Sequence, residues 1–223
     1  MHKSILNDLW QVGGDQLTAP GDAAAYLMRC GDRAVLVDAG CGGGHRKLVA
    51  NIDGCLQASE RLTHLLLTHC HFDHTGGAQA VRQTYGCKIV AHAEDAVYLE
   101  AGDSEVTAAA WYGSKMPPLA VDIKLSQRKT RIDIGDRVIT AHHWPGHSPG
   151  SMVYVANMED KVVLFGQDVH GPIHPALLSD PVRYQDSLKI LLSLEADLLL
   201  EGHFGVIVGK NAVHRFIRSY MDR

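Results

Sequence analysis

The sequence contains no apolar run long enough to span a membrane, and its first residues do not resemble a secretion signal. A spanning helix needs about 20 consecutive apolar residues, whereas the apolar stretch 191–200 is interrupted by Glu195 and Asp197. Asn7 and Asp8 lie where a signal peptide would have its apolar segment. We therefore expect a soluble, cytoplasmic protein with no membrane partner.

The sequence also lacks a strongly basic segment and a paired cysteine pattern, which limits the expected binding partners and the expected cellular compartment. No segment is dense in lysine and arginine, and 21 basic against 25 acidic residues give a net charge of −4. The chain thus lacks the basic stripe that follows nucleic-acid phosphates. The five cysteines are an odd set whose nearest members, Cys30 and Cys41, are 11 positions apart, which fits neither a disulfide framework nor a zinc ribbon. We expect no nucleic-acid partner and a reducing compartment.

The bulk composition of the 223 residues is that of an ordinary folded protein. Hydrophobic residues make up 46% and charged residues 21%, which argues against a disordered or fibrous chain. The length would allow one large domain or two small ones. No low-complexity segment, flexible linker or internal repeat divides the chain, so we predict a single domain over residues 1–223.

Strand and helix signals alternate along the chain and predict an α/β fold. The expected strands, bounded by turn residues, are 9–12, 24–30, 34–38, 62–68, 88–91, 121–125, 138–142, 152–155, 162–165 and 197–200. The expected helices are 46–57, 77–85, 181–192 and 211–220, the third of them capped by Asp180 and opened by Pro181. Each half places strands before helices, so we predict two sheets packed face to face with helices outside, the first sheet opening with an antiparallel meander.

Three histidines and an aspartate lie within six residues, directly after a predicted buried strand. They belong to the segment His69-Cys70-His71-Phe72-Asp73-His74, and α/β folds place their chemistry just past the carboxyl ends of strands. Residues two apart in an extended chain point the same way, so His69 and His71 can share one metal ion. Asp73 and His74, after a bend, can face a second ion. The unusually high histidine count, 14, also points to metal binding.

Three later residues occupy comparable positions behind predicted strands. His147 lies in a turn after the strand 138–142, Asp168 follows the strand 162–165, and His203 follows the strand 197–200. Each alone is more typical of a turn residue or a cap. Together with the histidine cluster they complete five histidines and two aspartates, which is the ligand inventory of a two-metal site.

These seven residues, in this order, resemble the ligand motif of the metallo-β-lactamase superfamily, and within it the glyoxalase II-like hydrolases. The segments Val37-Asp38-Ala39-Gly40 and Pro145-Gly146-His147-Ser148-Pro149-Gly150-Ser151 add to the resemblance, which spans about residues 9–208. It implies an αββα sandwich of two mixed β-sheets with outer helices and metals at one edge. It further implies that one ion binds His69, His71 and His147, that a second binds Asp73, His74 and His203, and that Asp168 bridges them.

The same resemblance implies a dinuclear metal-dependent hydrolase in which a metal-bridging hydroxide attacks a small ester, thioester or lactone. The ligand types suit Zn²⁺, Fe²⁺ and Mn²⁺, and we expect two divalent ions per chain, zinc first, with iron or manganese as alternatives. We expect Asp73 and His170 to act as catalytic residues that handle protons, and Asp38 to orient a metal ligand. Cys41 and Cys70 are expected to be packing residues, and His174 is left without an assigned role.

The segment after Asp168 leaves the substrate open. Glyoxalase II proper has glycine-rich and basic glutathione-binding residues there, and related lactonases have a tyrosine three residues after the aspartate, where this chain has Gly171. A persulfide dioxygenase with a single iron and a phosphodiesterase are alternatives with similar motifs, and a non-enzymatic metal-binding module is a third. We expect a small-molecule substrate, with the region 93–118 acting either as a lid or as the contact of a homodimer.

Overall fold

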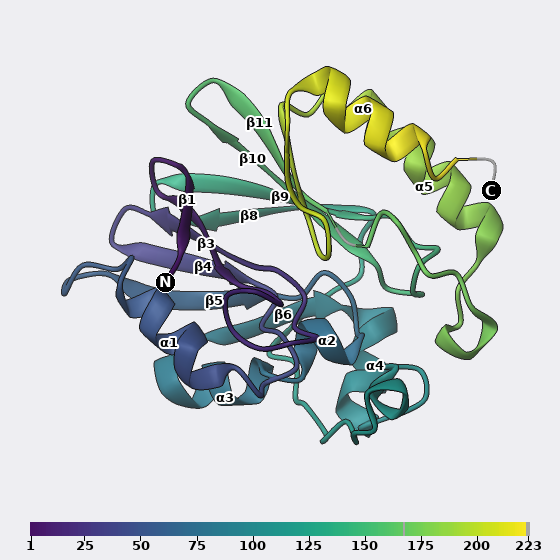
Figure 1. Ribbon diagram of the computed structural model, residues 1–223, viewed down its shortest axis with the longest axis horizontal. Coiled ribbons are helices and arrows are strands. Elements are labelled where there is room, and N and C mark those ends of the chain that lie inside the picture. Colours follow the sequence, from purple (N-terminus) through teal and green to yellow (C-terminus); the bar gives the residue numbers. More distant parts are fainter. Residues whose placement is uncertain (167, 222–223) are drawn as a thin grey trace.

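Two β-sheets pack face to face and helices cover both outer faces in the computed structural model, which describes residues 1–166 and 168–221 (Figure 1). The first sheet contains, in spatial order, β1 (Lys3–Leu6), β2 (Leu9–Gly13), β3 (Ala25–Cys30), β4 (Arg33–Val37), β5 (Arg61–Leu66), β6 (Lys88–His92) and β7 (Ile123–Leu125). The second contains β13 (Gly205–Val208), β12 (Leu198–Glu201), β11 (Lys161–Phe165), β10 (Met152–Met158), β9 (Arg137–His143) and β8 (Lys129–Ile134).

Both sheets are mixed, as predicted. Strands β1 to β4 form an antiparallel meander, whereas β4, β5, β6 and β7 run parallel to one another. In the second sheet only the β11–β12 pair is parallel among the described pairings. The predicted αββα sandwich of two mixed sheets with outer helices is therefore confirmed.

The helices lie on the two outer faces of the sandwich. They are α1 (His45–Asp53), α2 (Phe72–Thr75), α3 (Ala78–Tyr85), α4 (Ala93–Ala101), α5 (Pro181–Ser193) and α6 (Lys210–Arg218), with 3₁₀ turns η1 (Ala109–Tyr112) and η2 (Pro175–Leu177). Helices α1, α3 and α4 cover the first sheet, and α5 and α6 cover the second (Figure 1). Asp180 caps α5 as predicted, because its carboxylate accepts hydrogen bonds from the Val182 and Arg183 amides. Among the described residues, no helix has the length and apolar character needed to cross a bilayer.

The core has three layers because strand side chains alternate between the two faces of a sheet. On β4, Leu36 packs beneath the helices of the first sheet, whereas Val35 and Val37 face the second sheet. The middle layer contains large buried residues from both sheets, including Tyr26 and Phe165, whose rings meet edge to face. The outer faces of β10, β11 and β12 form a third layer with α5 and α6.

Three strands, β1, β8 and β13, are absent from the sequence-based assignment. All three are edge strands of their sheets, and many of their residues are exposed or half-buried. An edge strand packs on fewer neighbours and tolerates charged residues, as in Lys129–Ile134. The segments of β1 and β8 therefore lack the continuous apolar signal by which the central strands are recognised, whereas β13, with the sequence Gly-Val-Ile-Val, is apolar but only four residues long.

Asp95, on α4, joins two loops that lie next to each other at one edge of the sandwich. Its carboxylate is 1% exposed and accepts hydrogen bonds from the Cys70 amide (2.8 Å), the Ser148 hydroxyl (2.7 Å) and the Gly150 amide (2.6 Å). Burial raises the pKa of Asp95, and these donors oppose the shift. Asp95 therefore fixes the segment after β5 against the loop between β9 and β10.

Replacing Asp95 by alanine should lower the free energy of unfolding by about 3 kcal/mol, because buried donors lose their acceptor and each such loss costs about 1–3 kcal/mol. Chemical denaturation would measure the difference. Asp133→Ala is the matched control, since Asp133 is exposed and its partner Arg131 is also exposed; it should change stability by less than about 0.5 kcal/mol. Equal effects of the two variants would contradict the role given to Asp95.

Candidate metal centre

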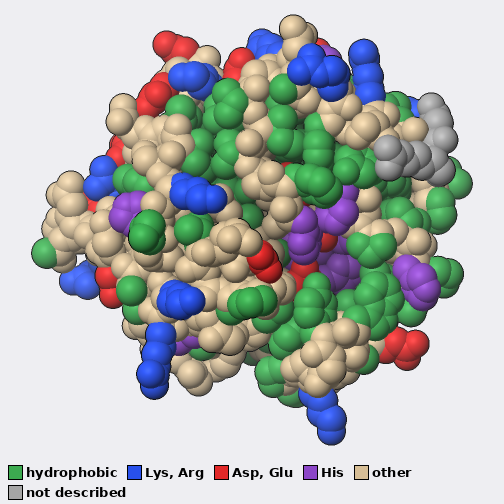
Figure 2. Space-filling model, viewed as in Figure 1, with side chains coloured by type: hydrophobic (Ala, Val, Ile, Leu, Met, Phe, Trp, Pro, Cys, Tyr) green, Lys and Arg blue, Asp and Glu red, His purple; other side chains and the backbone are tan. Residues whose placement is uncertain are grey.

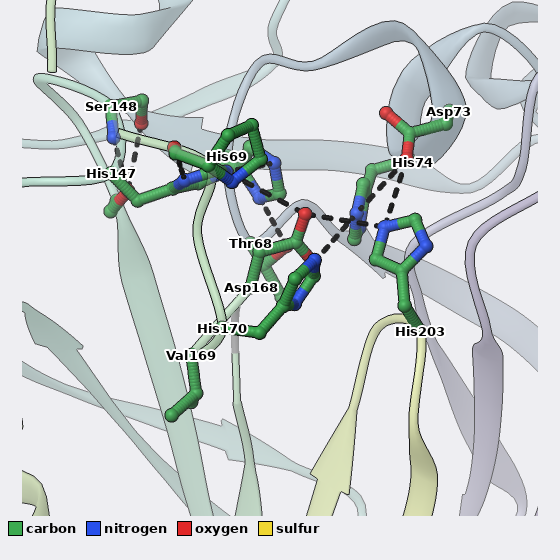
Figure 3. Close-up of polar contacts among 12 residues, drawn as sticks. Thr68, His69, Asp73, His74, His147, Ser148, Asp168, Val169, His170 and His203 are labelled. Atoms are coloured by element: carbon green, nitrogen blue, oxygen red, sulfur yellow. Dashed lines mark hydrogen bonds and ion pairs between the residues drawn. The ribbon is translucent and has the colours of Figure 1, made fainter. Parts of the chain in front are cut away.

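The seven predicted ligands follow strands, in loops and in one short helix, and meet at one edge of the sandwich; six of them are labelled in Figure 3. His69 and His71 follow β5, and the short helix α2 carries Asp73 and His74. The remaining three come from the second sheet: His147 lies between β9 and β10, Asp168 follows β11, and His203 lies in the turn between β12 and β13. The structure thus brings together all seven residues from both halves of the chain.

The first group of ligands is made of His69, His71 and His147. One ring nitrogen from each lies within 4.8 Å of the others, and the Nε2 atoms of His69 and His147 are 3.2 Å apart. Tetrahedral zinc binds imidazole nitrogen at about 2.0–2.1 Å, so three nitrogens at this spacing can surround one ion. All three side chains are buried.

The second group is made of Asp73, His74, Asp168 and His203. Their ligand atoms also lie within 4.8 Å of one another. His203 Nε2 is 3.1 Å from Asp73 Oδ2 and 3.2 Å from Asp168 Oδ2, and His74 Nε2 is 3.1 Å from Asp168 Oδ1. Asp168 Oδ2 is also 3.6 Å from His147 Nε2 in the first group. Asp168 therefore lies between the two groups, where the sequence predicted a bridging residue.

Buried polar atoms without partners test whether these residues fit a metal. His71 Nε2, His74 Nε2 and Asp168 Oδ1 are buried and form no hydrogen bond of good geometry within the described part of the chain, although His74 Nε2 and Asp168 Oδ1 lie 3.1 Å apart as an ion pair. Buried polar atoms are almost always hydrogen-bonded, because leaving one unsatisfied costs free energy. These three point among the other ligands, and a cation bound there would satisfy them. The donor set fits divalent metal ions.

The first group is held in the protonation state that binds metal. Burial lowers the pKa of His69, His71 and His147, and repulsion from neighbouring imidazoles adds to the shift at His69 and His71. The pKa of His71 falls to about 3. Neutral imidazole is the form that ligates metal, so these three residues are ready to bind at neutral pH.

The second group carries opposite charges in close contact. Burial alone would favour neutral imidazoles, but the carboxylates of Asp168 and Asp73 outweigh it, so the pKa of His74 is raised strongly and that of His203 rises to about 10. The same contacts lower the pKa of Asp73 and Asp168 despite their burial. Protons on these two imidazoles balance the carboxylates where a cation would otherwise do so.

Buried hydrogen bonds orient the ligand rings. The Asp38 carboxylate accepts from His74 Nδ1 at 2.7 Å and from the Thr68 hydroxyl at 2.7 Å, as predicted for a carboxylate that supports a ligand. The Thr68 oxygen lies 3.0 Å from His69 Nδ1, and His147 Nδ1 donates to the Pro172 carbonyl at 2.9 Å. Because Nδ1 is engaged on these three rings, Nε2 is the atom left to bind metal.

A glycine makes room for this arrangement. A side-chain carbon at Gly202 would lie 2.3 Å from Asp168 Oδ1 and 2.7 Å from His74 Cε1, closer than non-bonded atoms approach. Gly202 precedes His203 in the tight turn between β12 and β13. The turn can bring His203 to the other ligands because this position has no side chain.

His170, the predicted proton-transfer residue, lies beside the second group. Its ring centroid is 5.0 Å from that of His203, and its Nδ1 is 2.8 Å from Oε1 of Glu201. Glu201 is fully buried and also accepts from the amides of His203 and Phe204. His170 is thereby fixed next to the candidate metal centre through Glu201.

Other residues singled out in the sequence lie outside the ligand groups. The Cys70 side chain packs in the core beneath the first sheet, as expected for a packing residue. The Cys41 sulfur lies 3.3 Å from the Gly21 carbonyl, and this partly buried side chain packs against the same core. His174 accepts a hydrogen bond from the Ala176 amide and contacts the Trp111 ring.

Three supporting residues are absent from the sequence-based predictions: Thr68, Asp95 and Glu201. Glu201 has a signal in retrospect, because it is the charged residue that ends the apolar strand β12 immediately before Gly202 and His203. Thr68 follows β5, and a threonine at the end of a strand gives no distinctive sequence signal. Asp95 gives no local signal, since its partners Cys70, Ser148 and Gly150 are far away in the sequence.

A separate cluster, His92, Glu94 and His143, does not have the geometry of a metal site. The two imidazole rings are stacked, with centroids 3.6 Å apart and planes 14° from parallel. An imidazole lone pair lies in the plane of its ring, so nearly parallel rings at this spacing cannot both direct a nitrogen at one ion. Burial and the neighbouring His143 lower the pKa of His92 to about 4, which keeps that ring neutral within the stack.

Comparison with known proteins identifies the family. The model of the metallo-β-lactamase superfamily matches residues 18–203. Acyl-coenzyme A thioesterase MBLAC2 of Gallus gallus is 26% identical over 255 residues, which cover 100% of this chain and 86% of the relative. The probable metallo-hydrolase MJ0888 of Methanocaldococcus jannaschii is 28% identical over 186 residues, which cover 80% of this chain and 86% of the relative.

Solved structures share the fold. The subclass B3 metallo-β-lactamase BJP-1 of Bradyrhizobium japonicum superposes with a TM-score of 0.79 at 21% identity, covering 98% of this chain and 90% of its own. MIM-1 of Novosphingobium pentaromativorans gives a TM-score of 0.78 at 22% identity, covering 98% and 86%. Both matches cover nearly the whole chain. The chain belongs to the metallo-β-lactamase superfamily and is a metal-dependent hydrolase.

Proposed function

We propose that the protein hydrolyses a small ester, thioester or lactone at a centre of two divalent metal ions, with a thioester as the favoured substrate. The observation that carries this proposal is the position of Asp168, whose Oδ2 is 3.6 Å from His147 Nε2 in one ligand group and 3.2 Å from His203 Nε2 in the other. A carboxylate shared by two ligand groups suits a pair of adjacent ions. We expect zinc, because imidazole and carboxylate are its usual ligands.

A thioester is favoured because a relative that aligns with the whole chain is named an acyl-coenzyme A thioesterase. Hydrolysis forms a bond between the water oxygen and the acyl carbon and breaks the carbon–sulfur bond, and the departing sulfur takes up a proton. Two divalent ions, when bound, supply an activated water and polarise the substrate carbonyl. A glyoxalase II-like hydrolase acts on the same type of bond.

In this proposal some residues of the chain orient the candidate ligands, and others transfer protons. Asp38 and Thr68 hold the rings of His74 and His69. His170 has its Nδ1 bonded to Glu201, so its Nε2 is the atom that delivers a proton to the leaving group. Asp73, whose Oδ2 contacts His203, is the second residue we assign to proton handling.

Elemental analysis tests the number and identity of the ions. Protein purified without chelator should contain about two zinc ions per chain and hydrolyse acetyl and longer acyl thioesters of N-acetylcysteamine. Chelator treatment should abolish this hydrolysis, and added zinc should restore it. A single iron per chain, with oxygen-dependent formation of sulfite from a persulfide, would instead identify an iron dioxygenase and overturn the proposal.

Asp38→Asn should weaken binding of the ion held by His74. The amide has the shape of the carboxylate but lacks its charge, and loss of such a supporting partner typically reduces metal affinity about 10- to 100-fold. Competition with a chromophoric chelator would show one ion lost early and the other retained. The control is Asp122→Asn, since Asp122 is partly exposed, with its carboxylate bonded to the Ile89 amide, and lies outside both ligand groups. Equal retention of both ions in Asp38→Asn would refute this role.

His170→Gln should reduce kcat about 100-fold, the usual contribution of a positioned proton donor, without loss of metal. Glutamine keeps a hydrogen-bonding side chain of similar reach but cannot transfer the proton. Steady-state kinetics with parallel metal analysis would separate the two effects. His214→Gln is the control, because His214 lies on α6 and pairs with Glu195 away from the ligands. Full activity in His170→Gln would assign proton transfer elsewhere.

A further inference from the structure

The candidate metal centre opens to solvent through apolar side chains. A cavity of about 100 Å³ contains four ligands and His170 at its base. Its other lining residues are Ala108, Trp111, Tyr112, Pro172 and Leu177. Figure 2 shows histidine and acidic side chains grouped at this position with hydrophobic side chains directly beside them. The base of the cavity is thus polar, whereas its wall is mainly apolar.

The apolar wall comes from two segments that support each other. Trp111 and Tyr112 end the 3₁₀ turn η1, while Leu177 ends η2. The Trp111 ring meets that of His174 at 5.3 Å, next to η2, and the Tyr112 ring meets that of Phe72 at 6.0 Å. Both aromatic side chains are therefore held at the mouth of the cavity by packing.

These aromatic side chains remain substantially exposed, with 52% of Trp111 and 42% of Tyr112 accessible to solvent. Single exposed apolar residues are common on protein surfaces, but a group of them beside a pocket marks a binding site. Burying this surface against an apolar ligand would be favourable by the hydrophobic effect.

The charges that line the cavity indicate which part of a substrate can bind along its apolar wall. No lysine or arginine lines the cavity among the residues that the structure describes, so an anionic group such as a phosphate or a carboxylate has no cationic partner on the wall. Asp73 lines the same cavity as Tyr112, and its carboxylate makes the wall still less favourable for an anion. An uncharged hydrocarbon chain is the group that matches it.

We propose that Trp111, Tyr112 and Leu177 form an acyl-chain site that selects thioesters with hydrocarbon acyl groups. The proposal rests on the hydrolase function proposed above. With the carbonyl at the ligands, the acyl chain extends along the wall, and the polar thiol portion points away from it toward solvent. Trp111 and Tyr112 are then specificity-determining residues.

The chain-length dependence of hydrolysis tests this site. For acyl thioesters of N-acetylcysteamine from acetyl to octanoyl, kcat/KM should rise about fourfold per methylene over the first few carbons, as expected for burial of each CH₂. In Trp111→Ser the ratio of octanoyl to acetyl kcat/KM should fall at least tenfold, and Tyr112→Ser should act in the same direction. Val208→Ser, an exposed apolar position on β13, should leave the ratio unchanged.

A binding measurement separates this inference from the proposed function. Titration with octanoate should change the tryptophan fluorescence of the wild type but not that of Trp111→Phe, which retains Trp10 and Trp144. Thioester hydrolysis that is independent of chain length would overturn the acyl site while leaving the hydrolase function intact. Octanoate binding at Trp111 without hydrolysis of any thioester would retain the site and overturn the function. An unchanged octanoyl-to-acetyl ratio in Trp111→Ser would also refute the site.

Discussion

Charge balance among buried carboxylates and imidazoles is the constraint on which the candidate metal centre depends. Asp38, Asp73 and Asp168 surround His74, which is fully buried. Buried charges are tolerated only when they are paired or bind an ion. In the protein alone, the raised pKa values of His74 and His203 supply the positive charge. Metal ions would displace these protons, so metal binding and proton release are linked in this site.

The sandwich provides rigid positions for ligands that come from distant parts of the chain. Its three core layers lie along the bodies of the strands, while the ligands lie in loops at the strand ends. Loops are the least constrained part of a fold. Here buried hydrogen bonds fix the positions of loops that packing in the core does not hold. Asp95 ties the His69–His74 segment to the His147 loop, and Glu201 ties His170 to the His203 turn.

The central elements, and the residues that meet as candidate metal ligands, could be predicted from the sequence because their signals are local. The apolar run before His69 and the dense histidine cluster each lie within a few residues, and the central strands have continuous apolar character. The edge strands β1 and β8 lack this character, since each has a neighbouring strand on one side only and contains charged residues. Asp95 could not be recognised, because its function arises only when Cys70 and Ser148 meet it in the folded chain. The apolar wall at Trp111 could not be recognised either, since it depends on a contact with His174, which is distant in the sequence.

Gly202 limits how this centre could be redesigned or could diverge. The space that a side-chain carbon would need is already filled by Asp168 and His74. No further side chain can therefore be introduced at this position, and even alanine would push the Asp168 carboxylate away from its neighbours. The other side of the cavity is less crowded, because Trp111 is 52% exposed and belongs to neither ligand group. The cavity therefore has one side that tolerates no added atom and one side that is open to substitution.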